Sequence, residues 1–307
     1  MVSRIKPTLY NRIIEKKIRI NSYQELHPDL EKQLQQQKRI EYIHSSNAIE
    51  GNTLTLGETA AAINGETING KTIKEHFEAI NHPKAINYII EQAKTRDPIT
   101  DETIKHIHVL LMDHLLTEPG AYRTGATMIG GAHFMPPKST EIPEKISELL
   151  EWLNRNLYEY PPIELASRFM HRFLVTHPYQ DGNGRTARLL MNLILMKNGY
   201  PVLTNISIRD RKQYLRALRE ADHGEPSLIV NLVAMSVEDS LTKHIIMVEE
   251  TETYSLREAA QHSPYTQEYL GLRARDGSLG AYKNGRNWRV TIEDLEQYVE
   301  LNQSRTK

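Results

Sequence analysis

The stretch HPYQDGNGRTAR, residues 177–188, says most about how this chain folds. Apolar residues on one face predict a helix over 162–175, and Pro178 ends it because proline disfavours helical backbone in the residue before it. The strongly apolar segment 186–197 follows and is predicted to be a second helix. The stretch is therefore a glycine-containing loop that connects two helices and opens the second.

This loop combines the residue types that bind phosphate. Backbone N–H groups at a helix start have no partner within the helix, and together with the helix dipole they form an anion site. Gly182 and Gly184 let the backbone approach a phosphate closely. Arg185 and Arg188 add positive charge in a fork geometry that suits phosphate oxygens. We therefore predict a phosphate site at the start of the second helix.

Two further side chains of the loop are suited to chemistry on that phosphate. Asp181 offers a hard oxygen ligand for a Mg²⁺ ion that bridges phosphates. His177, whose pKa is expected near neutrality, can take a proton from an incoming hydroxyl. These are the groups that phosphoryl or nucleotidyl transfer needs, because that chemistry depends on positioning and charge neutralisation. An ordinary interhelical turn would explain the Gly-Asn-Gly sequence alone, but not all of these groups within twelve residues.

The stretch 177–188 resembles the signature of Fic domain proteins, His-Pro-Phe-x-(Asp/Glu)-Gly-Asn-Gly-Arg-x-x-Arg, and departs from it only at Tyr179. The resemblance covers about residues 40–235. It implies a helical bundle that transfers AMP from ATP, with Mg²⁺, to a Ser, Thr or Tyr hydroxyl of a protein target or of the protein itself. It implies that His177 is the general base and that Asp181 holds Mg²⁺. It also implies nucleotide contacts by Gly182, Asn183, Gly184, Arg185 and Arg188.

Two short extended runs around Gly130-Gly131 predict a β-hairpin over residues 124–134. A plain surface hairpin is the alternative, but beside this loop it resembles the flap of Fic proteins, which clamps the target segment as an added strand. Its nucleotide contacts are expected at Thr127, Met128, Ile129 and Gly130. Tyr214 and Asp222 fall where Fic proteins contact adenine and ribose, although the family commonly has Asn at the second position.

The segment SNAIEG, residues 46–51, resembles the inhibitory motif of Fic proteins, (Ser/Thr)-x-x-x-Glu-(Gly/Asn). A carboxylate placed against Arg188 would take the partner that the γ-phosphate needs and would repel the phosphate. Glu50 is therefore expected to inhibit the protein by pairing with Arg188. The alternative is a helix C-terminus, ended by Gly51, with a solvated glutamate.

The C-terminal segment 255–300 has a pattern of its own. It predicts two short helices, a hairpin with strands over 279–282 and 288–290, and a last helix. This order resembles the winged helix-turn-helix of the excisionase and MerR-like family. The basic residues that could form a DNA face are Arg273, Arg275, Lys283, Arg286 and Arg289. Acidic residues in the last helix offset that charge, so a protein-docking or dimerisation role stays open.

The whole chain is expected to be mainly α-helical, in four parts. These are a helical region with the inhibitory helix (1–100), a Fic core (101–248), a linker (249–254) and the winged-helix-like module (255–307). Helices are predicted over 28–50, 74–94, 100–114, 143–154, 162–175, 186–197, 209–221 and 226–248.

Composition excludes several classes of function. The chain has no cysteine, which excludes disulfides, thiolate catalysis and cysteine–zinc sites. A formal net charge of -1 gives no global attraction to nucleic acid or membrane. No apolar run approaches the roughly 20 residues of a membrane helix, and the first ten residues lack the apolar part of a signal peptide. A soluble cytoplasmic protein without membrane partners is therefore expected.

Three hypotheses for the whole protein stay open. The first is an autoinhibited adenylyltransferase that uses ATP and Mg²⁺. The second is a DNA-binding regulator whose Fic domain senses nucleotide or modifies itself, and the third is removal of AMP through Glu50. The resemblance also allows a homodimer, since Fic proteins of this type often dimerise. His106 and His108 are not expected to share a metal because they point to different helix faces, and His171 is expected to be a packed structural residue.

Overall fold

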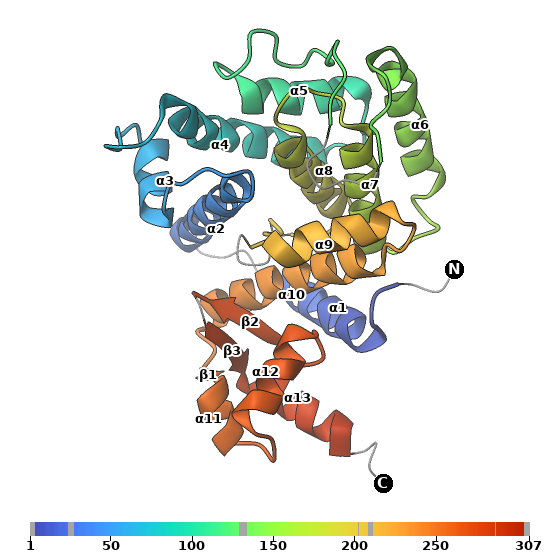
Figure 1. Cartoon of the computed structure of the whole chain (residues 1–307). Coiled ribbons are helices and arrows are strands. Elements are labelled where there is room, and N and C mark those ends of the chain that lie inside the picture. The colour runs from blue at the N-terminus through green and yellow to red at the C-terminus, as the bar shows by residue number, and fades with distance from the viewer. Residues whose placement is uncertain are drawn as a thin grey trace. The chain divides into compact units, whose positions relative to one another are not determined.

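The computed structural model describes residues 4–23, 28–128, 134–201, 203–207, 211–285 and 287–303. These residues are mainly helical and include one three-stranded sheet (Figure 1), which confirms the predicted fold class. The chain divides into two compact units, residues 1–4 with 35–233 and residues 5–34 with 234–307. Within the described ranges, no helix is both long enough and apolar enough to cross a membrane.

The first unit consists of helices joined by short connections. Its elements are α2 (Pro28–Ile49, from residue 35), α3 (Leu56–Ile63), α4 (Ile73–Lys94), α5 (Asp101–Met112), the 3₁₀ turn η1 (Ser139–Glu141), α6 (Ile142–Arg155), α7 (Pro162–Thr176), α8 (Asn183–Lys197), α9 (Arg211–Asp222) and the start of α10 (Ser227–Glu249). Thr55, Thr72 and Thr100 each accept a hydrogen bond from the backbone N–H three residues on, and so cap α3, α4 and α5.

Helix α8 forms the centre of this unit. Helices α4, α5 and α7 pack against it, and Figure 1 shows α8 among them. Its residues 185–195 are buried without interruption, so α8 has no exposed polar face. The preceding loop, residues 177–182, is thereby held at the N-terminus of a buried helix.

The predicted hairpin over residues 124–134 is not seen in the described part of the chain. Residues 124–128 and Phe134 form no strand, and residues 129–133, which include Ile129 and Gly130, lie outside the described residues. The Arg123 guanidinium donates to the carbonyl of Gly125 at 2.8 Å and to that of Pro137 at 2.6 Å. These carbonyls are therefore bound by a side chain rather than by a neighbouring strand.

The second unit contains helix α1 (Pro7–Asn21), most of α10 and the C-terminal module. The elements of the module are β1 (Thr253–Ser255), α11 (Leu256–Gln261), α12 (Gln267–Arg275), β2 (Ala281–Asn284), β3 (Asn287–Thr291) and α13 (Ile292–Gln303). The sheet is antiparallel in the order β1-β3-β2, with Tyr254 opposite Val290 and Tyr282 opposite Arg289. The predicted linker 249–254 is too long, because α10 includes Glu249 and pairing with β3 makes Thr253 part of a strand.

Buried ion pairs connect α1 to the rest of the second unit. Arg12 contacts Glu238 at 2.6 Å, and Lys16 contacts Glu238 at 3.1 Å and Asp294 at 2.9 Å. Arg12 also donates to the carbonyls of Gly277 and Ser278. Buried charges are stable when they are paired and hydrogen-bonded in this way. Helix α1 therefore packs with α10 and the C-terminal module, a long-range relation that composition does not reveal.

Candidate active site

The loop between α7 and α8 is closed by its own side chains. His177 ends α7 in the left-handed conformation, with φ +44°, and its N–H donates to the Phe173 carbonyl at 3.0 Å. The Asn183 amide accepts from the Tyr179 N–H at 3.0 Å and donates to the Tyr179 carbonyl at 2.8 Å. The Asn183 side chain thus stabilises the conformation of the loop, and Asn183 is also the first residue of helix α8.

Gly182 is required by both conformation and space. It lies at φ +79°, where residues with a side chain are strained. A Cβ atom at this position would lie 2.6 Å from Met112 Sδ and 3.3 Å from His108 Nε2. Glycine therefore lets the loop lie directly against α5.

His108 on α5 supports the loop through a hydrogen bond and a ring contact, a role that the sequence did not predict. Its Nδ1 accepts from the Gly120 N–H at 2.8 Å, so its Nε2 carries the proton and donates to the Asp181 carbonyl at 2.9 Å. Its ring stacks on that of Tyr179, with centroids 3.6 Å apart. Burial lowers the pKa of His108 to about 4, which keeps this neutral form at physiological pH. The residue pattern gives no local signal for these contacts.

His177, the predicted base, lies half-buried at the start of the loop. The Nε of Arg123 donates to its carbonyl at 2.9 Å, and the Arg123 N–H donates to the Pro178 carbonyl at 3.0 Å. Burial, and then the charge of Arg123, lower the pKa of the His177 imidazole. The ring is therefore neutral near pH 7, the form that accepts a proton.

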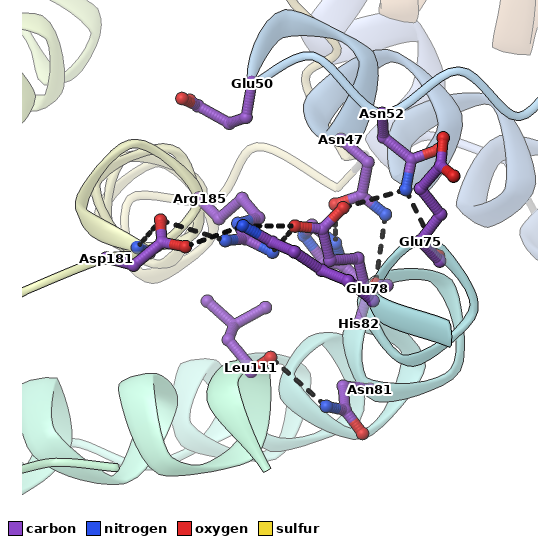
Figure 2. A network of polar contacts seen from close by, with 12 residues as sticks. Asn47, Glu50, Asn52, Glu75, Glu78, Asn81, His82, Leu111, Asp181 and Arg185 are labelled. Carbon is purple, nitrogen blue, oxygen red and sulfur yellow. Dashed lines mark hydrogen bonds and ion pairs between the residues drawn. The ribbon is translucent and has the colours of Figure 1, made fainter. Parts of the chain in front are cut away.

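Four charged side chains of alternating sign lie next to one another beside the loop. Arg185 contacts Glu78 Oε1 at 3.1 Å and Asp181 Oδ1 at 3.4 Å, and Figure 2 shows Arg185 between these carboxylates. Lys74 Nζ lies 3.1 Å from Asp181 Oδ2 and 3.9 Å from Glu78 Oε1. Burial opposes ionisation of Asp181, but Arg185, the Gly182 N–H and Lys74 outweigh it and lower its pKa. Asp181 is therefore a carboxylate at neutral pH.

Asp181 fits the predicted magnesium ligand. Its side chain is 43% exposed, so its hard oxygens can be reached from solvent. Among the described residues no group of three His, Asp or Glu side chains is placed to hold a metal alone. Mg²⁺ commonly binds through one or two carboxylates while substrate phosphates and water complete its octahedron, and a single aspartate matches that mode.

Arg188 is buried and fully engaged by the end of α2. Its Nη1 donates to Glu50 Oε1 at 2.8 Å, its Nε to Ser46 Oγ at 3.0 Å and its Nη2 to the Ser46 carbonyl at 2.8 Å. A Cβ atom on Gly184 would lie 2.0 Å from Glu50 Oε1. The predicted pairing of Glu50 with Arg188 is therefore present, and the carboxylate lies against the first turn of α8.

The other residues predicted to contact the nucleotide lie on α9 and in the segment predicted as the flap. Tyr214 is buried, and its hydroxyl has no hydrogen-bond partner among the described residues. Asp222 Oδ1 lies 2.8 Å from His171 Nε2, so His171 is a packed partner of Asp222. Thr127 and Met128 are described, and the Met128 side chain is exposed.

The structure thus brings together His177, Asp181, Arg185, Arg188 and Glu50 around the first turn of α8. Their arrangement combines a helix start without a side-chain cap among the described residues, two arginines, an ionised carboxylate and a neutral imidazole. The fold and the site define a class of protein, namely mainly helical proteins in which a glycine-containing loop with two arginines opens a buried helix.

Comparisons with known proteins place the chain within this class. The profile of the Fic/DOC family matches residues 98–195. Protein adenylyltransferase fic-1 of Caenorhabditis elegans is 34% identical over 209 residues, which are 66% of this chain and 41% of that protein. Protein adenylyltransferase Fic of Nematostella vectensis is also 34% identical over 209 residues, which are 67% of this chain and 48% of that protein.

Solved structures agree with the sequence relatives. A Fic-1 variant from Caenorhabditis elegans matches with a TM-score of 0.69 and 30% identity, over 78% of this chain and 71% of that one. A Fic family protein from Desulfovibrio desulfuricans G20 matches with a TM-score of 0.65 and 26% identity, over 96% of this chain and 85% of that one. The chain belongs to the Fic/DOC family. It spans less than half the length of the two curated relatives named above.

Proposed function

We propose that this protein transfers AMP from ATP to a hydroxyl side chain of a protein target or of itself. The observation that carries the proposal is the loop 177–188, where a neutral His177 and an ionised Asp181 lie at the N-terminus of the buried helix α8. The names of the adenylyltransferase relatives support the same reaction. The flap residues Thr127, Met128, Ile129 and Gly130, with Tyr214 and Asp222, complete the proposed nucleotide site.

In the proposed reaction His177 takes the proton of the target hydroxyl. The hydroxyl oxygen then forms a bond to the α-phosphorus, the bond between that phosphorus and the α,β-bridging oxygen breaks, and pyrophosphate leaves. Arg185 and Arg188 pair with the β- and γ-phosphates once their present carboxylate partners release them. Mg²⁺ held at Asp181 would neutralise charge on the phosphates.

Glu50 serves as the brake in this proposal. Its carboxylate takes one donor of Arg188 and lies against Gly184, where a phosphate would approach the helix start. A nucleotide must therefore displace Glu50 or bind in a geometry that does not suit in-line attack. Misplacement by about 1 Å can cost on the order of 10²-fold in rate.

We further propose that the C-terminal module is a winged helix-turn-helix that binds either DNA or a protein. Arg273 pairs with Asp276 at 2.8 Å, and the Arg289 guanidinium donates to Thr253. Arg286 lies outside the described residues. Lys283 Nζ lies 5.1 Å from the centroid of the Trp288 ring, so at least three of the five predicted basic residues have partners within the module. These contacts favour the enzyme over the DNA-binding regulator. Removal of AMP through Glu50 remains the alternative reaction.

Transfer from labelled ATP separates AMP transfer from phosphorylation. ATP labelled at the α-phosphate should label the protein or its target, whereas ATP labelled at the γ-phosphate should not. Label from the γ-phosphate alone would contradict the proposal and indicate phosphoryl transfer. The proposed homodimer and cytoplasmic location are tested separately, by light scattering of the purified protein and by fractionation of cells.

A further inference from the structure

Every oxygen of the Asp181 carboxylate has a partner from within the chain. Oδ1 accepts from the Gly182 N–H at 2.6 Å and lies 3.4 Å from Arg185 Nη2. Oδ2 accepts from Lys74 Nζ at 3.1 Å. The Lys74 ammonium group therefore occupies a position beside Asp181 Oδ2 that a bound cation would otherwise take.

The three charged side chains near Asp181, those of Lys74, Arg185 and Glu78, differ in how firmly they are held. The side chains of Arg185 and Glu78 are 2% and 7% exposed, and the Asn52 amide donates to Glu78 Oε2 at 2.8 Å. The Lys74 side chain is 60% exposed. Removing a buried charge from its partner is costly, whereas exposed ion pairs contribute little and rearrange readily. Lys74 is therefore the member of this group that a ligand can displace.

We propose that Lys74 is an internal cation that competes with Mg²⁺ for Asp181. This inference rests on the proposed function and concerns how its metal step is regulated. Without metal, the ammonium neutralises Asp181 and adds positive charge close to the phosphate site. When metal binds, Lys74 leaves Oδ2, and Glu78 Oε1, already 3.9 Å from its Nζ, remains to pair with it.

The proposed competition predicts the direction in which Lys74 changes the coupling between Mg²⁺ binding and nucleotide binding. Because Lys74 partly replaces the metal charge, it strengthens nucleotide binding in the absence of Mg²⁺ and weakens the additional effect of Mg²⁺. Removing the ammonium should therefore increase the coupling between Mg²⁺ and nucleotide. An exposed ion pair of this kind changes an equilibrium by up to about fivefold, which sets the expected size.

The test is the affinity of an ATP analogue with a methylene group between the α- and β-phosphorus atoms, measured by titration calorimetry. The protein is the full chain with Glu50→Gly, so that the brake does not limit binding. The Kd in EDTA divided by the Kd in saturating Mg²⁺ gives the coupling. Lys74→Met should raise this ratio by about twofold to fivefold, and Lys74→Arg should leave it near the parent value.

Lys84→Met is the matched control. Lys84 also lies on α4, is 50% exposed and pairs with an exposed carboxylate, Asp113, at 3.3 Å. This variant should not change the ratio. Equal ratios in Lys74→Met and the parent, or a raised ratio in Lys74→Arg, would overturn the inference about Lys74 while leaving the proposed function intact. No binding of the analogue to any of these proteins, with or without Mg²⁺, would contradict the proposed function and this inference with it.

Discussion

The Glu50 carboxylate lies directly against Gly184. An added Cβ atom on that glycine would come within 2.0 Å of Glu50 Oε1, and the same oxygen accepts from Arg188 Nη1 at 2.8 Å. The absence of a side chain at residue 184 thus makes room for the Glu50 carboxylate, at the position where the proposed function places a phosphate. In the proposed function, Glu50 is therefore an internal anion that pairs with Arg188 in place of the nucleotide.

Glu50→Gly is expected to tighten ATP binding by at least about tenfold. It removes the charge that repels the γ-phosphate and frees Nη1 of Arg188, and one charge-assisted hydrogen bond is worth about 1.5–3 kcal/mol. Titration calorimetry with Mg²⁺-ATP measures the change. Glu66→Gly, an exposed glutamate outside the helices, is the control and should bind as the wild type does. Equal affinities in all three proteins would mean that Glu50 does not restrain the nucleotide.

Arg123→Met is expected to lower the rate of AMP transfer by at least about tenfold. Its guanidinium donates to the carbonyls of His177, Gly125 and Pro137, and so connects the backbone of the proposed base to Gly125 and Pro137. Small displacements of reacting groups carry rate costs of this size. In single-turnover measurements the nucleotide Kd should change less than the rate.

Arg123→Lys separates positioning from folding. Lysine keeps the charge but lacks the planar fork that reaches three carbonyls, so the rate should recover only in part. Circular dichroism should show an unchanged helix content. An Arg123→Met protein that is folded and transfers AMP at the wild-type rate would show that Arg123 does not position the base.

Tyr179→Phe is expected to stabilise the protein by about 1 kcal/mol. The Tyr179 ring is fully buried and its hydroxyl has no hydrogen-bond partner among the described residues. An unsatisfied buried polar group costs about 1–3 kcal/mol, part of which phenylalanine recovers. Urea unfolding measures the change, and Tyr158→Phe, at a side chain 98% exposed, should change stability by less than about 0.5 kcal/mol. A less stable Tyr179→Phe protein would show that the hydroxyl has a bound partner.

His108 should make the folded state sensitive to acid. Its pKa is about 4 in the folded protein, below its ordinary value of 6.5, so the unfolded state binds more protons between these pH values. Stability therefore falls as the pH falls from about 6.5 to 4, by up to about 3 kcal/mol from this group. His108→Gln should flatten this part of the curve of unfolding free energy against pH. The pKa of the buried His82 is also lowered, so some dependence of the unfolding free energy on pH should remain in this variant. An identical slope in the variant would rule out this role for His108.

The sequence predicts the loop and its two helices because their signals are local. Pro178, Gly182 and the apolar segment after them determine where α7 ends and α8 begins, and the expected bounds agree with the structure within a few residues. The pairing of Glu50 with Arg188 was also predicted, through a short motif that resembles a known one.

The contacts that were missed are long-range. His108 lies 73 residues before its partner Asp181, and Lys74 lies 107 residues before the same residue. Helical periodicity shows which face of α4 or α5 is buried, but not which loop that face meets. The predicted hairpin is not confirmed, because residues 124–128 and Phe134 form no strand and residues 129–133 lie outside the described residues.

The central claim is that the loop 177–188 transfers AMP with His177 as base and Glu50 as brake. The most direct test incubates the wild type, Glu50→Gly and the double variant Glu50→Gly, His177→Ala with Mg²⁺ and ATP labelled at the α-phosphate. We predict strong labelling of protein with Glu50→Gly, weak labelling with the wild type and none with the double variant. Equal labelling with Glu50→Gly and the double variant, or none with Glu50→Gly despite measurable ATP binding, would contradict the account.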